Sequence, residues 1–150
     1  MKRTSAFALL CTVLLAPSAP AQNGIVPPID SLPAVILNGF TQFSKSGTLA
    51  AVDAWLAGSA RENDDDYQDA VRARLDRVRG RYGQYLGFEV VRAIDLSRST
   101  KRCYLAVKFE KGIGWMSFDC YKPADNWIVT RFDFQTNANL VFPQNILGGQ

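Results

Sequence analysis

Histidine is missing from this chain of 150 residues, and cysteine is scarce, at three residues. Without histidine, Ser-His-Asp and Cys-His catalytic groups and the usual zinc sites cannot form. No glycine-rich segment matches a P-loop or a Rossmann fingerprint. We therefore expect no metal site, no cofactor and no catalytic group of these common types.

Long hydrophobic runs are also lacking, and the most apolar segment lies at the N-terminus. Lys2 and Arg3 precede the apolar residues 6–16, and a cleavage sequence of the A-x-A type follows at 19–21. The apolar segment is about half as long as the ~20 residues that a membrane-spanning helix needs. We predict a signal peptide over 1–21, export to the periplasm or medium, and no membrane span. An uncleaved membrane anchor is the alternative.

Cleavage of the signal changes both charge and cysteine content. Of 17 basic and 14 acidic residues, Lys2 and Arg3 are lost, which leaves 15 basic residues against 14 acidic ones. A charge so close to neutral gives no argument for a nucleic-acid partner. Cys11 is lost as well, and the remaining pair, Cys103 and Cys120, favours a disulfide over metal ligation in an oxidising compartment.

The mature chain is expected to hold one domain. Residues 22–32 contain two adjacent prolines and predict an extended lead-in, residues 33–143 form the domain, and 144–150 are a flexible tail. Within the domain, helical periodicity covers 33–47, 48–58 and 64–83, each segment ending at a glycine. The period then changes to two over 88–96, 102–110, 113–121 and 127–135, which predict four strands. The fold class is α+β, with three N-terminal helices packed on a curved four-stranded antiparallel sheet.

The register of the central hairpin follows from its turn. A two-residue loop at Lys111-Gly112 pairs Glu110 with Ile113 and places Cys103 directly opposite Cys120. Facing positions of this kind lie ~4.5 Å apart at their Cα atoms, at the short end of the ~4.4–6.8 Å that a disulfide accepts. We predict a cross-strand disulfide; two reduced cysteines packed side by side are the alternative.

Alternation along the strands assigns side chains to two faces. The face toward the helices carries mainly apolar residues: Cys103, Leu105, Val107, Phe109, Met116, Phe118, Cys120, Ile128, Phe132 and Phe134. The opposite face carries most strand carboxylates and four large aromatics, namely Tyr104, Trp115, Tyr121 and Trp127. Because aromatic patches of this kind usually mark contact surfaces, we predict that these four residues form a homodimer interface. In the alternative arrangement, residues 140–147 cover the rings within one chain.

Three helices followed by a curved sheet, joined at the glycines of 83–87, resemble the nuclear-transport-factor-2-like, or cystatin-like, α+β roll. The stretch 85–134 is similar to small exported bacterial members of that superfamily with no assigned function. The segments WMSFDCY (115–121), KPADN (122–126) and WIVTRFDF (127–134) carry this resemblance. The superfamily includes enzymes of the ketosteroid-isomerase and limonene-epoxide-hydrolase types and members that only bind ligands or partners, so the resemblance implies a fold more than a function.

Ligand-pocket candidates are few. The inward face offers Arg92 and Thr130, with Tyr82 and Tyr85 at the rim, and no inward carboxylate that could serve as an isomerase base. We therefore predict an exported binding or interaction module that self-associates through the aromatic face. A small pocket enzyme of the ketosteroid-isomerase type, acting on an apolar ligand, is the alternative.

The third helix carries five arginines, Arg72, Arg74, Arg77, Arg79 and Arg81. Such a run can bind a polyanion, but it more often forms a solvated helix face. Asp69 and Asp76 lie within pairing distance along the same helix. We interpret the run as a solvated face and expect no nucleic-acid partner.

Overall fold

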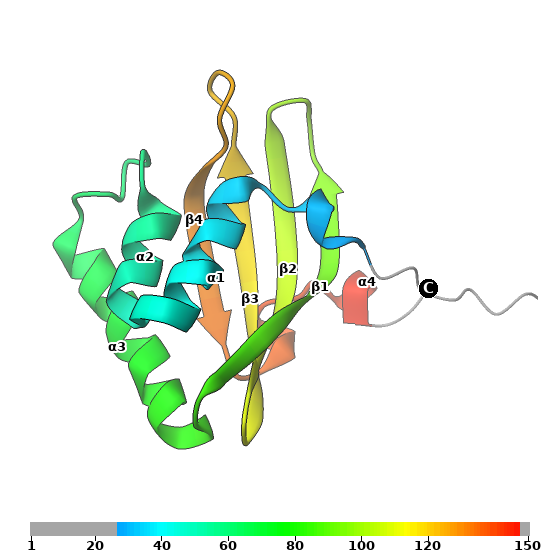
Figure 1. Ribbon diagram of the computed structural model, residues 1–150. Coiled ribbons are helices and arrows are strands. Elements are labelled where there is room, and N and C mark those ends of the chain that lie inside the picture. Colours follow the sequence, from blue (N-terminus) through cyan, green and yellow to red (C-terminus); the bar gives the residue numbers. More distant parts are fainter. Residues whose placement is uncertain (1–26, 148–150) are drawn as a thin grey trace, which may run out of the picture.

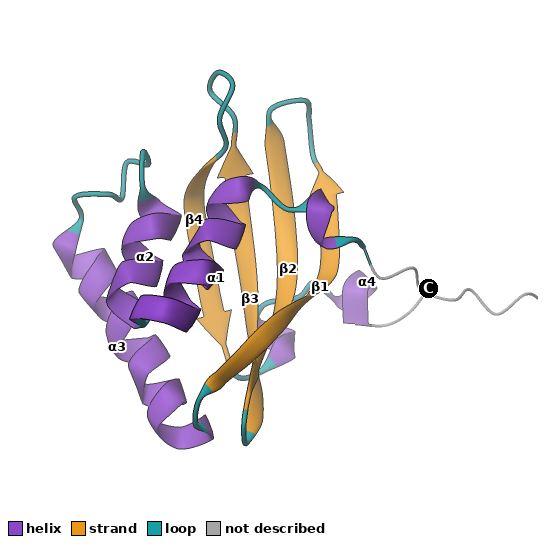
Figure 2. Cartoon of the chain, viewed as in Figure 1, coloured by secondary structure: helices purple, strands orange, loops and turns teal. Residues whose placement is uncertain are grey.

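The computed structural model describes residues 27–147, which form an α+β domain with helices and strands in separate layers (Figure 1, Figure 2). Three helices come first and an open antiparallel sheet follows. The elements are η1 (Ile29–Ser31), α1 (Ala34–Ser46), α2 (Thr48–Leu56), α3 (Asp65–Tyr82), β1 (Tyr85–Asp95), β2 (Thr100–Phe109), β3 (Gly112–Tyr121), β4 (Ile128–Gln135), η2 (Ala138–Leu140) and α4 (Gln144–Leu147). The predicted fold class is confirmed at this level.

The helix boundaries follow local signals in the sequence. Gly47 and Gly83 have φ values of 86° and 85°, a conformation that residues with a Cβ rarely adopt, and each ends a helix. The Asp64 carboxylate accepts the Tyr67 N–H at 3.1 Å and caps α3. This hydrogen bond, together with the bond from Arg61, lowers the pKa of Asp64. Within the expected tail 144–150, residues Gln144–Leu147 form α4, and residues 148–150 lie outside the described part of the chain.

The sheet has the order β1-β2-β3-β4, but the turn of the central hairpin lies one residue earlier than predicted, which shifts the pairing of β2 with β3 by two residues. Phe109 pairs with Gly112, so Glu110-Lys111 is the loop. Gly112 is needed for close packing rather than for the turn, because a Cβ there would overlap the Tyr82 ring. The shift moves Cys103 opposite Phe118 instead of Cys120. Since the shift involves two positions, the predicted faces of β2 and β3 are unchanged.

Two β-bulges reverse the predicted faces in the outer strands. In β1, Val90 pairs with Leu105 and Arg92 pairs with Tyr104, which leaves Val91 as the extra residue. Arg92 therefore shares the outer face with Tyr104 and is exposed, which contradicts its predicted inward position.

The bulge in β4 has the same effect on the other edge. Its extra residue is Thr130, between Arg131 opposite Asp119 and Val129 opposite Cys120. Val129 is buried in the core in place of the predicted Ile128, and Thr130 is exposed.

The helical layer and the sheet meet around Trp55. The indole is fully buried, and its Nε1–H donates to the carbonyl of Ile36 at 3.1 Å. Gly39, one turn further along α1, gives the ring its space, because a Cβ there would overlap the indole. Tight approach of α1 and α2 thus depends on a glycine inside a helix, where alanine would otherwise be preferred.

We predict opposite effects for two glycine-to-alanine substitutions in helices. Gly39→Ala should destabilise the fold by about 1–3 kcal/mol, since overpacking outweighs the gain in helix propensity. Gly80→Ala, on exposed α3 with no atom within 4 Å of the added Cβ, should stabilise it by up to ~1 kcal/mol. Urea denaturation of both variants measures the difference, and equal effects would contradict the proposed role of Gly39.

Candidate functional site

The space between helices and sheet is filled by aromatic side chains. The Trp55 ring lies 5.1, 5.5 and 5.3 Å from the rings of Phe40, Phe118 and Phe132. Phe118 and Phe132 are themselves stacked at 5.5 Å. The packed rings fill the space between the helices and the sheet, where a ligand would otherwise lie.

Buried carboxylates are missing from the interior that the structure describes. Between residues 27 and 147 the buried polar side chains are those of Thr48, Ser59 and Gln68. An isomerase base would need a carboxyl group that reaches a substrate in an apolar pocket. The interior thus gives the alternative enzymatic function no support. In the same range, no group of three or more acidic or cysteine side chains lies together as a metal site would require.

Of the predicted pocket residues, Tyr82 and Tyr85 both pack against Phe109, whereas Arg92 and Thr130 are exposed. Tyr85 lines an open apolar hollow of about 500 Å³ between α1 and β1, and burial raises its pKa to about 12. Tyr82 packs against Phe109 at the end of the sheet. Arg92 is exposed, and the Thr130 hydroxyl donates to the carbonyl of Asp119 at 3.0 Å.

Comparisons with family models, with curated proteins and with solved structures gave no match. The resemblance to the nuclear-transport-factor-2-like roll therefore stays a prediction, compatible with the α+β architecture and the open sheet. None of the helices described between residues 27 and 147 is long and apolar enough to cross a membrane.

The aromatic sheet face is covered at its centre by the C-terminal segment. Phe142 is 5% exposed and meets the rings of Tyr104 and Trp115 edge-on, at 5.4 and 5.2 Å. This is the arrangement that the sequence left as the alternative to an interface. Of the other two candidates, Tyr121 is 41% exposed. Trp127 is half-buried against the core, beneath the ammonium group of Lys101.

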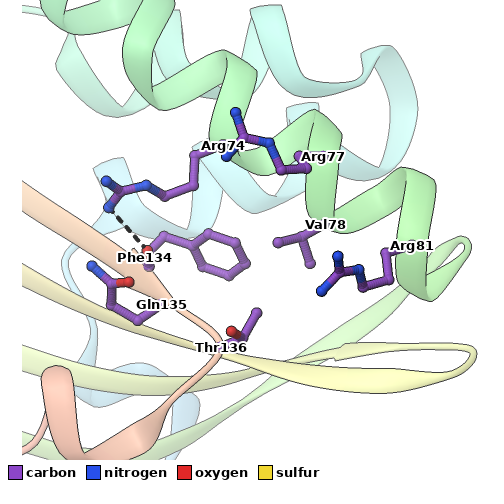
Figure 3. Close-up of a pocket in the computed structure, with 7 residues that line it drawn as sticks. All are labelled: Arg74, Arg77, Val78, Arg81, Phe134, Gln135 and Thr136. Atoms are coloured by element: carbon purple, nitrogen blue, oxygen red, sulfur yellow. Dashed lines mark hydrogen bonds between the residues drawn. The ribbon is translucent and has the colours of Figure 1, made fainter.

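A groove between α3 and the end of β4 gathers positive charge (Figure 3). It measures about 230 Å³, and Arg74, Arg77 and Arg81 line it from α3. Val78 and Phe134 supply apolar lining, and Gln135 and Thr136 lie at the end of β4.

The five arginines of α3 have different surroundings. Arg72 bonds to Asp53 and Asp69 at 2.6 and 3.1 Å, and Arg79 lies over the ring of Phe43. Arg74 bonds to Asp133 and to the carbonyl of Phe134, both at 3.3 Å. Arg77 and Arg81 make no ion pair with any residue that the structure describes. The expectation of one uniform solvated face missed this division, which the spacing of positions 74, 77 and 81 along one helix face could have indicated.

Cys103 and Cys120 are buried, unbonded and diagonal to each other on the core side of the sheet. Hydrogen bonding between the two thiols lowers the pKa of Cys103 and raises that of Cys120, and burial adds to the rise at Cys120. Each thiol therefore influences the pKa of the other, although the strands do not place the two residues opposite each other as predicted.

We predict that the two cysteines form a disulfide in the exported protein, by exchange with a disulfide oxidant. Diagonal Cα atoms lie ~7–8 Å apart, beyond the ~4.4–6.8 Å that a disulfide accepts, so the strands must shift locally. The pairing of β3 with β4 is already irregular beside Cys120, so we expect the strands to shift at this position. For a loop of this size the bond should stabilise the fold by about 3 kcal/mol, less any strain.

Mass spectrometry of unfolded protein, alkylated without reduction, measures the outcome. We expect no alkylated cysteine, and two alkylated cysteines after prior reduction as the control. Two modified thiols in the unreduced sample would instead identify the pair as a buried dithiol.

Proposed function

We propose that this protein is an exported binding module of unassigned role that acts through its surface. The filled interior carries this proposal. Trp55, Phe118 and Phe132 occupy the region in which an enzyme of the ketosteroid-isomerase type would need its substrate cavity. The described residues place no buried carboxylate beside these rings.

The alternative, a small enzyme acting on an apolar ligand, has one feature in its favour. The hollow at Tyr85 is apolar and open, and Phe40, Leu86 and Phe88 contribute to its lining. Among the residues that the structure describes, its lining contains no carboxylate, and Tyr85 is the only ionisable side chain there. A phenol whose pKa is raised to about 12 stays protonated at neutral pH, so it can donate a hydrogen bond but cannot act as a base.

Self-association through the aromatic face remains part of the proposal, with an added condition. Phe142 packs on Tyr104 and Trp115, so a second copy can reach these two rings only after the C-terminal segment moves away. Tyr121 is accessible without that movement. The C-terminal segment and a second copy are therefore competing occupants of one surface.

Export and binding can be tested together on protein recovered from the cell that expresses the full-length gene. We expect a periplasmic or secreted protein whose mass corresponds to a chain beginning at Gln22. Native mass spectrometry should show a bound species that is released on denaturation. A chain retaining residues 1–21 in the membrane fraction would contradict export, and a protein that turns over a ketosteroid would contradict the surface-binding proposal.

We predict that Phe142→Ala promotes dimer formation, because it uncovers Tyr104 and Trp115. Sedimentation equilibrium at high micromolar concentration should show a larger dimer fraction than for the unsubstituted protein. Leu140→Ala is the matched control, since Leu140 is 65% exposed and belongs to the same segment. If the Phe142 variant is folded by circular dichroism and remains monomeric, the homodimer prediction fails.

A further inference from the structure

We infer that the groove between α3 and β4 binds an amphiphilic organic anion. Its oxyanion head would lie among the arginines, and its apolar tail would lie along the seam, the line where α3 packs against β4. This inference rests on the proposed binding function and names the ligand class. The head would be a carboxylate or a phosphate monoester, since both match the planar fork of an arginine.

The head site is defined by the charge of the groove. Arg74, Arg77 and Arg81 are spaced so that they follow one face of α3, and among residues 27–147 no acidic side chain lines the groove with them. Arg74 is held in place by Asp133 and by the carbonyl of Phe134. The guanidinium groups of Arg77 and Arg81 have no carboxylate partner among residues 27–147, so an anionic ligand would supply the missing counter-charge.

The tail site is defined by apolar surface next to these charges. Val78 and Phe134 line the groove between the arginines and β4 and are 9% and 2% exposed (Figure 3). A second hollow of about 140 Å³ continues along the same seam and shares Arg74 and Phe134 with the first. Its other lining residues are Tyr67, Ala70, Val71, Phe132 and Asp133.

The helix dipole does not account for this arrangement of charge. A cation near the C-terminus of a helix is favoured only within the last turn, so the dipole explains Arg81 but not Arg74 or Arg77. Two other arginines of α3 have partners within the chain. Arg72 bonds to two aspartates, and Arg79 packs over the ring of Phe43. Two arginines without an ion pair among the described residues, Arg77 and Arg81, lie beside apolar side chains and match a ligand that is itself both anionic and apolar.

Titration with four probes tests both halves of the ligand. Octanoate and octyl phosphate carry the head and tail together, octanol lacks the charge, and acetate lacks the tail. In ¹H–¹⁵N correlation spectra of the mature protein we expect saturable shifts at Val78, Phe134 and Thr136 with octanoate or octyl phosphate. The tighter of the two identifies the head group. Octanol and acetate should each bind at least about tenfold more weakly.

The double variant Arg77→Gln, Arg81→Gln should weaken binding of the charged amphiphile by about tenfold or more, because two charge-assisted hydrogen bonds are lost. The matched control is Arg98→Gln, Lys111→Gln. It removes the same charge from exposed loop positions that make no ion pair in the described chain, and it should leave the affinity unchanged.

Three results would overturn the inference: equal weakening by both double variants, binding of octanol as tight as that of octanoate, or shifts scattered over the whole surface. None of these would contradict the broader binding function, which depends on whether a species co-purifies with the exported protein. If a co-purified species survives the Arg77 and Arg81 substitutions, the module binds elsewhere and only the groove assignment fails.

Discussion

Burial of the Trp55 indole is the constraint on which the rest of the structure depends. A ring of this size, with a polar N–H, is stable in a core only if that group finds an acceptor, and the carbonyl of Ile36 provides it. The ring also requires a glycine at position 39, so Ile36 and Gly39 of α1 both accommodate Trp55 of α2. Once the indole lies between the helices and Phe118 of β3, the middle of the roll is filled. The binding function that we propose therefore relies on the surface of the domain.

Strand alternation predicted the faces of β2 and β3 correctly, and helical periodicity located α1, α2 and α3. The register of the hairpin could not be predicted from its glycine. Gly112 looked like a turn residue, but no residue of the Glu110-Lys111 loop has a positive φ, and the glycine serves the contact with Tyr82. A turn can be predicted from sequence when its glycine supplies a left-handed conformation; a glycine that makes room for a distant ring gives the same local signal.

The predicted inward position of Arg92 was wrong for a related reason. A single extra residue, Val91, reverses the face of everything that follows it in β1, which moves Arg92 from the interior to the surface. The adjacent valines of this strand give no indication of which one is the bulge. The arginine groove was missed because it depends on β4 returning beside α3, about 60 residues later in the chain, as the bond from Arg74 to Phe134 shows. Local patterns place residues on elements, whereas sites of this kind arise from contacts between elements.

Both broad faces of the sheet are already occupied over much of their area. The helices cover one face, and Phe142 of the C-terminal segment covers the centre of the other. Two recessed surfaces lie at the margins of the layers: the apolar hollow beside β1 and the cationic groove beside β4. The hollow and the groove differ in how selectively each can bind a ligand. An apolar hollow attracts any apolar surface, whereas a groove that combines fixed charge with apolar lining selects a ligand by both properties. This difference is why we propose the groove between α3 and β4 as the specific binding site.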